Sequence, residues 1–188
     1  MRKPLLFLIV AICVAAGFRH FWPDFSTIAG ADDGHGAVAD LDQPLQHAVL
    51  PSLSNDWVDL STYKGQVVLL VFWTTWCPGC VDEVPSLIRL QQEFGDKGFT
   101  VVAVLVADDG EESVESFVGK RHFPVHGDSL PINYPILLGS EEGARKLGFE
   151  GGLPTSILVN REGREVKIFR GVVGEAVFAR VIQKTLRD

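Results

Sequence analysis

The sequence is poor in cysteine, with three in 188 residues. Cys13 lies in an apolar stretch near the N-terminus, so Cys77 and Cys80 are the only cysteines in the rest of the chain. Small exported domains that are held together by disulfides normally contain more than two cysteines. The scarcity argues against a structural disulfide framework and directs attention to the one close pair.

The chain also lacks an excess of positive charge. Its 17 Lys and Arg face 24 Asp and Glu, which gives a net charge of −7. Without Arg2, Lys3 and Arg19 near the N-terminus, 14 basic residues face 24 acidic ones, a balance of −10. Because the phosphate backbone attracts basic surfaces, this composition argues against nucleic acid as a partner.

Long apolar runs are missing too. The uncharged run at residues 5–18 has about fourteen residues, fewer than the roughly twenty that span a membrane. Arg2 and Lys3 precede it, a pattern typical of a secretory signal or a short signal-anchor whose basic end stays inside while the chain is exported.

Two features bear on the fate of this segment. Val14-Ala15-Ala16 offers small residues for signal cleavage, whereas Phe18, Phe21 and Trp22 extend the apolar run with aromatic residues suited to the membrane interface. We expect residues 1–22 to be an uncleaved signal-anchor, with a cleaved signal peptide as the alternative.

Residues 23–44 are rich in Gly, Ala, Asp and Ser and have no periodicity, so we expect a flexible tether. Residues 45–188 suffice for one globular domain, without internal repeats. The patterns predict a small hairpin at Trp57–Leu60, strands at Val67–Phe72, Phe99–Val106, Tyr134–Leu138, Thr155–Val159 and Glu165–Phe169, and helices at about Pro78–Phe94, Glu111–Lys120, Glu141–Leu147 and Glu175–Arg187. This alternation predicts an α/β fold with a mixed sheet between helix layers.

The cysteine pair follows the most apolar of these strands. Val67–Phe72 is suited to a central strand covered on both faces, and Cys77-Pro78-Gly79-Cys80 follows at the start of a helix. Helix N-terminal N–H groups and the helix dipole stabilise a thiolate, which is the reactive form of cysteine. The arrangement favours redox chemistry.

Three groups of residues together resemble the thioredoxin superfamily, and most of all its membrane-tethered TlpA/ResA-like branch. They are Trp76-Cys77-Pro78-Gly79-Cys80, then Glu83 and Pro85, then Gly152-Leu153-Pro154-Thr155 before a strand. The resemblance covers about residues 45–186. It implies a thioredoxin-like fold with an N-terminal β-hairpin and an insertion at roughly Glu111 to Tyr134.

The two thiols have different expected roles. Cys77, at or beside the helix N-cap, is expected to be exposed and to act as the attacking thiolate. Cys80, one turn further and facing the core, is expected to resolve the mixed disulfide.

Neighbouring residues are expected to form a client-binding surface. Pro78 occupies the first helical position, where its missing N–H costs nothing. Gly79 lets a client chain approach closely, and Trp76 forms an apolar rim beside the sulfurs. Trp73 is expected to pack in the core.

The resolving thiol needs a base. Thioredoxin has a buried Asp at the position of Val71, so that acid is missing here. Glu83 lies three residues after Cys80, on the same face of the helix, and matches a Glu that the TlpA/ResA-like branch places near its cysteines. We hypothesise that Glu83 is partly buried, has a raised pKa and shuttles the proton.

Pro154 forms the second half of the expected site. The resemblance implies a cis peptide bond before Pro154, a proline that packs across the two sulfurs. The backbone of Leu153 is then expected to pair with an extended client segment, as one strand pairs with another.

Other functions remain open. A structural zinc site needs four ligands, and only His122 and His126 are available to join the cysteines. A copper-carrying domain normally has a longer cysteine spacing. Thr74 stands three residues before Cys77, as in peroxiredoxins, but that family has a proline where Leu70 stands. A non-catalytic binding protein would not need both cysteines. We expect no metal and no cofactor.

The favoured function is thiol-disulfide exchange. The resemblance implies a protein on the outer side of a bacterial inner membrane that reduces disulfides of exported client proteins, with electrons from a membrane donor, for example in cytochrome c maturation. Secretion after signal cleavage is the alternative location.

Overall fold

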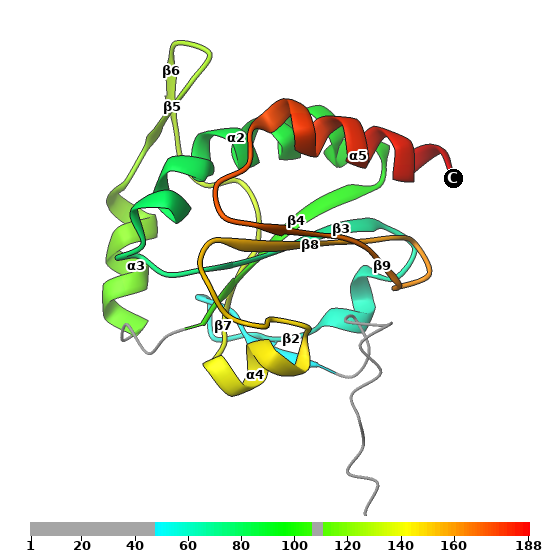
Figure 1. Ribbon diagram of the computed structural model, residues 1–188. Helices are drawn as coiled ribbons and strands as arrows, with labels where there is room; N and C mark the ends of the chain where they lie inside the picture. The colour runs from blue at the N-terminus through cyan, green and yellow to red at the C-terminus, as the bar shows by residue number, and fades with distance from the viewer. Residues whose placement is uncertain (1–47, 107–110) are drawn as a thin grey trace, which may run out of the picture. The chain divides into compact units, whose positions relative to one another are not determined.

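The computed structural model describes residues 48–106 and 111–188 (Figure 1). The predicted signal or anchor segment, 1–22, and the tether, 23–44, lie outside these residues. No helix in the described part of the chain is both long and apolar enough to cross a membrane.

The described chain contains nine strands and four α-helices. The strands are β1 (Val49–Pro51), β2 (Trp57–Asp59), β3 (Val67–Trp73), β4 (Phe99–Leu105), β5 (Phe123–Val125), β6 (Asp128–Leu130), β7 (Ile136–Leu138), β8 (Thr155–Val159) and β9 (Glu165–Arg170). The helices are α2 (Pro78–Phe94), α3 (Glu111–Lys120), α4 (Glu141–Lys146) and α5 (Glu175–Arg187), with short 3-10 helices η2 (Leu60–Tyr63) and η3 (Gly95–Lys97). The predicted elements are thus present, with most boundaries within two residues.

A five-stranded sheet forms the centre of the domain, in the order β7-β4-β3-β8-β9. β3 runs parallel to β4 and antiparallel to β8. The sheet is therefore mixed, as predicted. β1 and β2 form a separate antiparallel hairpin, which confirms the predicted N-terminal hairpin.

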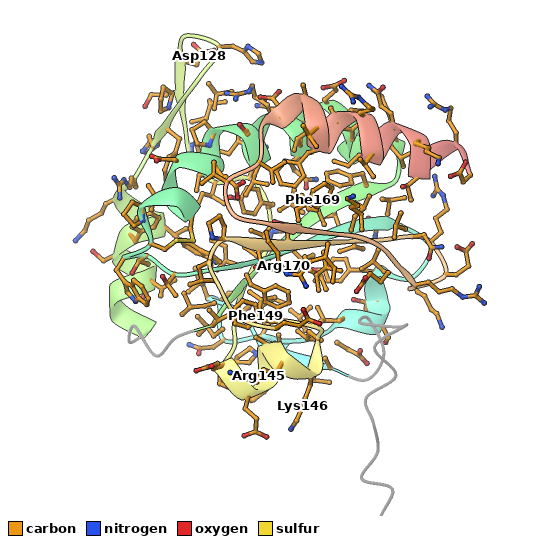
Figure 2. All side chains as sticks on the ribbon, viewed as in Figure 1. Asp128, Arg145, Lys146, Phe149, Phe169 and Arg170 are labelled. Atoms are coloured by element: carbon orange, nitrogen blue, oxygen red, sulfur yellow. A yellow bond between two sulfur atoms is a disulfide. The ribbon has the colours of Figure 1, made fainter. Side chains whose placement is uncertain are left out.

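The central strand β3 is covered on both faces. All seven of its residues are at most 4% exposed, and alternate side chains belong to two different apolar clusters. One cluster includes Trp73 and Phe169 and lies under α2 and α5, whereas the other includes Phe149 and lies on the α4 side (Figures 1 and 2). Because each buried large apolar side chain contributes about 1.5–3 kcal/mol, β3 is a rigid support for the loop that follows it.

Helix α2 begins immediately after Cys77, which is its N-cap. Its buried residues recur at helical spacing, so that one face packs against the sheet. Pro78 at the first position confirms the predicted start of this helix. The helix continues into η3, and Gly98 then turns the chain with a φ of 85° into β4.

The predicted insertion contains one element that the sequence pattern did not reveal. After α3 the chain forms the hairpin β5–β6, which extends away from the sheet (Figure 1). His126 and Gly127 at its tip have φ values of 53° and 92°, as a tight two-residue turn requires. The strands are only three residues long and β5 contains Pro124, so neither has a clear alternating pattern.

Candidate active site

Cys77 and Cys80 form a disulfide at the N-terminus of α2. The turn that leaves β3 is closed by a hydrogen bond from the Cys77 N–H to the Thr74 carbonyl, 3.4 Å long. The Cys77 Sγ in turn accepts a hydrogen bond from the Cys80 N–H at 3.2 Å. A thiolate at this position is stabilised by that N–H and by the helix dipole.

The prediction that Cys77 is exposed was wrong. Cys77 is only 7% exposed and Cys80 is 3% exposed. Both sulfurs belong to the apolar cluster under α2, against which Leu153 and Val173 also pack. Pro154 and Val172, from two loops distant in sequence, lie close to Gly79 between the two cysteines, a long-range effect that a local pattern does not contain.

Pro154 lies against the centre of the Cys-x-x-Cys motif. The Leu153–Pro154 peptide bond is cis, as predicted. A Cβ atom placed on Gly79 would lie 3.4 Å from the Pro154 Cδ. The position of Pro154 is fixed because the next residue, Thr155, begins β8 and pairs with Phe72 of β3. Leu153 is half-buried and packs against both apolar clusters.

A loop that the sequence analysis missed completes the surroundings of the motif. This loop comprises residues 171–174, between β9 and α5. Its residue Val172 is 62% exposed. A Cβ on Gly79 would lie only 2.8 Å from the Val172 Cγ2, so a larger residue at position 79 would force the Val172 side chain to shift. The Gly171 N–H donates to the Pro154 carbonyl at 2.9 Å. The two flanking glycines in Gly171-Val172-Val173-Gly174 were the available signal.

The residues around the disulfide present an apolar surface to solvent. Trp76 is 66% exposed and Val172 62%, and Pro78 is exposed as well. Single exposed apolar residues are common, but several around one reactive group indicate a contact surface for another molecule. The predicted client-binding role of Trp76, Pro78 and Gly79 stays a prediction.

Glu83 is the buried acid of this site. Its side chain is on α2, one turn after Cys80, and the residue is 2% exposed. Its Oε1 accepts a hydrogen bond from the Val173 N–H at 2.6 Å, whereas its Oε2 is buried without a partner among the described residues. Loss of hydration raises the pKa of Glu83 to about 7, although the Val173 hydrogen bond opposes this rise.

The predicted burial and raised pKa of Glu83 are confirmed, and the burial is nearly complete. With a pKa of about 7, the carboxyl both accepts and donates a proton readily near neutral pH. Val71 is 3% exposed, so β3 places an apolar side chain where thioredoxin has its acid. Tyr134, which no sequence pattern connects with the site, has a pKa raised by burial and by the charge of Glu83.

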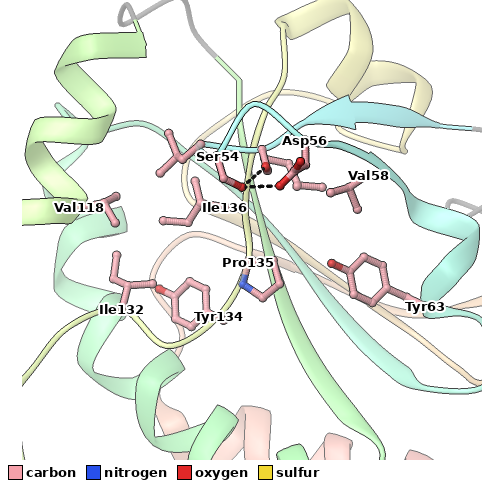
Figure 3. Close-up of a pocket in the computed structure, with 12 residues that line it drawn as sticks. Ser54, Asp56, Val58, Tyr63, Val118, Ile132, Tyr134, Pro135 and Ile136 are labelled. Carbon is pink, nitrogen blue, oxygen red and sulfur yellow. Dashed lines mark hydrogen bonds between the residues drawn. The ribbon is translucent and has the colours of Figure 1, made fainter.

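Tyr134 also lines a pocket of about 420 Å³ (Figure 3). The pocket lies between the β1–β2 hairpin and the chain that leads into β7, and the Ser54 hydroxyl bonds Ser52 and Asp56 at its edge. Neither cysteine nor Glu83 is among its lining residues. This pocket is therefore not part of the disulfide site.

Trp73 and the two histidines are the remaining residues that the sequence singles out. Trp73 is 4% exposed and its ring packs against Phe117, 5.6 Å away between centroids, so its expected place in the core is confirmed. His122 and His126 are exposed and lie on either side of β5.

Comparison with known proteins agrees with this geometry. Residues 23–182 match the redoxin family. The chain is 30% identical over 172 residues to the thiol-disulfide oxidoreductase ResA of Halalkalibacterium halodurans, an alignment that covers 90% of this chain and 86% of that protein. For ResA of Bacillus subtilis the identity is 29% over 170 residues, with 90% and 84% covered.

Solved structures show the same fold. A protein of Chlorobium tepidum assigned as the thiol:disulfide interchange protein DsbE has a TM-score of 0.65 and 27% identity, over 77% of this chain and 96% of that one. A secreted thiol-disulfide isomerase of Corynebacterium glutamicum has a TM-score of 0.65 and 24% identity, over 77% and 86%. With its disulfide at the start of α2 and these relatives, the chain belongs to the redoxin family, within the TlpA/ResA-like thiol-disulfide oxidoreductases of the thioredoxin superfamily.

Proposed function

We propose that this thiol-disulfide oxidoreductase works as a reductant of disulfides in exported client proteins, with Glu83 as its proton shuttle. The observation that carries dithiol exchange with a proton shuttle is the carboxyl of Glu83, buried one helical turn from Cys80 with a pKa of about 7. A buried thiol attacks poorly until it loses its proton, and an acid with a pKa near ambient pH is suited to remove that proton.

The exchange proceeds in two balanced steps. The Cys77 thiolate attacks one sulfur of the client disulfide, forms a mixed disulfide and releases the other client sulfur as a thiolate. Cys80 then passes its proton to Glu83 and attacks the Cys77 sulfur. This step closes the Cys77–Cys80 disulfide and releases the second client thiolate, so two electrons have passed to the client.

The surface around Cys77 supports a protein client. Trp76 and Val172 provide exposed apolar area around a sulfur that is itself only 7% exposed. Leu153 makes no backbone hydrogen bond to another described residue, which leaves its peptide groups available to an extended client segment.

The N-terminal segment supports an exported location. Arg2 and Lys3 precede the uncharged run at 5–18, so we propose that the domain lies outside the bacterial inner membrane, held by residues 1–22 or released from them. A dithiol protein of that membrane would regenerate the reduced pair. Membrane fractionation and the mass of the mature protein distinguish the anchored form from the released one.

The reduction potential of the purified protein tests the direction of electron flow. Equilibration with glutathione or dithiothreitol mixtures should give a potential nearer the roughly −270 mV of thioredoxin than the roughly −120 mV of the oxidant DsbA. In cells, alkylation of free thiols should find Cys77 and Cys80 mainly reduced. A potential near −120 mV with an oxidised pair in cells would contradict the proposed direction.

A further inference from the structure

Three buried polar side-chain atoms in the described residues have no hydrogen-bond partner, and all three belong to the region of the disulfide. They are Trp73 Nε1, Thr74 Oγ1 and Glu83 Oε2. Each such atom costs about 1–3 kcal/mol, and native proteins contain few of them. All three atoms lie close in sequence to Cys77 or Cys80, so a change in the redox state of the pair can change the groups available to them.

Thr74 is the one of these three residues that has a hydroxyl group. It is fully buried, with an exposed fraction of 0%, and it follows the last residue of β3. Its carbonyl accepts the Cys77 N–H at 3.4 Å, so residues 74–77 form a turn whose ends lie within about 7 Å of each other at their Cα atoms. The unpaired hydroxyl and the Cys77 sulfur are therefore attached to the two ends of one short turn.

The redox state changes what the sulfur accepts. In the disulfide, the Cys77 sulfur is neutral and a weak acceptor. Reduction by a dithiol or by two glutathione thiols adds two electrons and breaks the S–S bond. Cys80 takes up one proton and Cys77 remains a thiolate, a charged acceptor whose hydrogen bonds are roughly twice as strong as neutral ones.

We propose that the Thr74 hydroxyl donates a hydrogen bond to the Cys77 thiolate in the reduced protein and thereby stabilises the reduced form relative to the disulfide. It adds a second donor to the Cys80 N–H, which already bonds the Cys77 sulfur at 3.2 Å. The hydroxyl keeps its proton throughout. The proposal rests on the exchange activity alone and holds for either direction of electron flow.

The other two unpaired atoms are less suited to this role. The Trp73 N–H is held in place by the packing of its ring against Phe117, 5.6 Å away, whereas a hydroxyl hydrogen turns about a single bond. The Glu83 carboxylate is an acceptor, and when it carries a proton it is the partner of Cys80 in the proposed shuttle.

The test compares Thr74→Val, which removes the hydroxyl at nearly constant volume, with Thr74→Ser, which keeps it. A hydrogen bond to a charged group contributes about 1.5–3 kcal/mol, so Thr74→Val should shift the equilibrium with glutathione by about tenfold toward the disulfide. For a two-electron couple this is about 30 mV more negative. The pKa of the Cys77 thiol, followed by thiolate absorbance, should rise by about one unit, and Thr74→Ser should stay close to the parent in both measurements.

Two results would overturn the proposal. One is a Thr74→Val protein in which the pKa of Cys77 is unchanged and the reduced and disulfide forms lose the same free energy of unfolding. Equal losses would mean that the hydroxyl contributes to packing, or binds a water molecule, in both redox states. The other is a raised Cys77 pKa in Trp73→Phe but not in Thr74→Val, which would make the indole the donor. Should Thr74→Val fail to fold, Thr74→Ala provides the same comparison.

Discussion

Replacing Glu83 by Gln should remove a pH-dependent loss of stability in the disulfide form. Burial raises the pKa of Glu83 from 4.5 to about 7, so between these values the folded protein holds a proton that the unfolded chain has released. Stability from this group is fully present below pH 4.5 and is lost as the pH rises through about 7. At about 1.4 kcal/mol for each pH unit, the full loss over these roughly 2.5 units is about 3.5 kcal/mol.

Glutamine is a close match in shape, and its Oε1 can still accept the Val173 N–H that lies 2.6 Å from the carboxyl oxygen. Urea unfolding of parent and variant, both fully oxidised, at pH 4.5, 6 and 8 gives the difference between their free energies of unfolding. That difference should change by about 2–3 kcal/mol in favour of the variant as the pH rises. A difference that stays constant within about 0.5 kcal/mol would refute the raised pKa and, with it, the proposed proton shuttle.

Three further predictions concern the surface and packing of the site. Gly79→Ala should slow client reduction several-fold, because the new Cβ lies 2.8 Å from the Val172 Cγ2, and adding Val172→Ala should restore the rate in a single-turnover assay. Trp76→Ala should raise the KM for the client by about tenfold. Because Trp76 is 66% exposed, the same change should alter the free energy of unfolding by less than about 0.5 kcal/mol. An unchanged KM would exclude Trp76 from the client-binding surface. Arg89→Ala breaks the 2.6 Å ion pair with Glu175 that joins α2 to α5 and should cost about 0.5–1 kcal/mol in urea unfolding, less in about 1 M salt.

The sequence predicted the parts of the site that depend on local rules. The apolar run at Val67–Phe72 predicts a strand covered on both faces, and a proline after Cys77 predicts a helix that begins there. Because strand, turn and helix are contiguous in the sequence, their order alone places the Cys-x-x-Cys motif at the N-terminus of the helix. The position of Glu83 on the same helix follows from the helical repeat.

What the sequence did not predict comes from long-range packing. Val173 is separated from Glu83 by 90 residues, and no local pattern reports that its N–H reaches the carboxyl. Loops that follow α4 and β9 also approach the Cys-x-x-Cys motif at Gly79, a contact between segments distant in sequence. Tyr134 was assigned to a strand from its apolar neighbours, whereas β7 begins at Ile136 and the tyrosine precedes it.

Trapping of mixed disulfides tests most directly whether the Cys77 sulfur is the one that attacks the client disulfide. A Cys80→Ala variant, reduced and then mixed with a disulfide-bonded peptide, should form a stable 1:1 adduct that mass spectrometry locates on Cys77. The matched Cys77→Ala variant should form little adduct, because Cys80 is 3% exposed and faces the core. Equal adducts on the two variants, or an adduct on Cys80 alone, would contradict the assignment of roles.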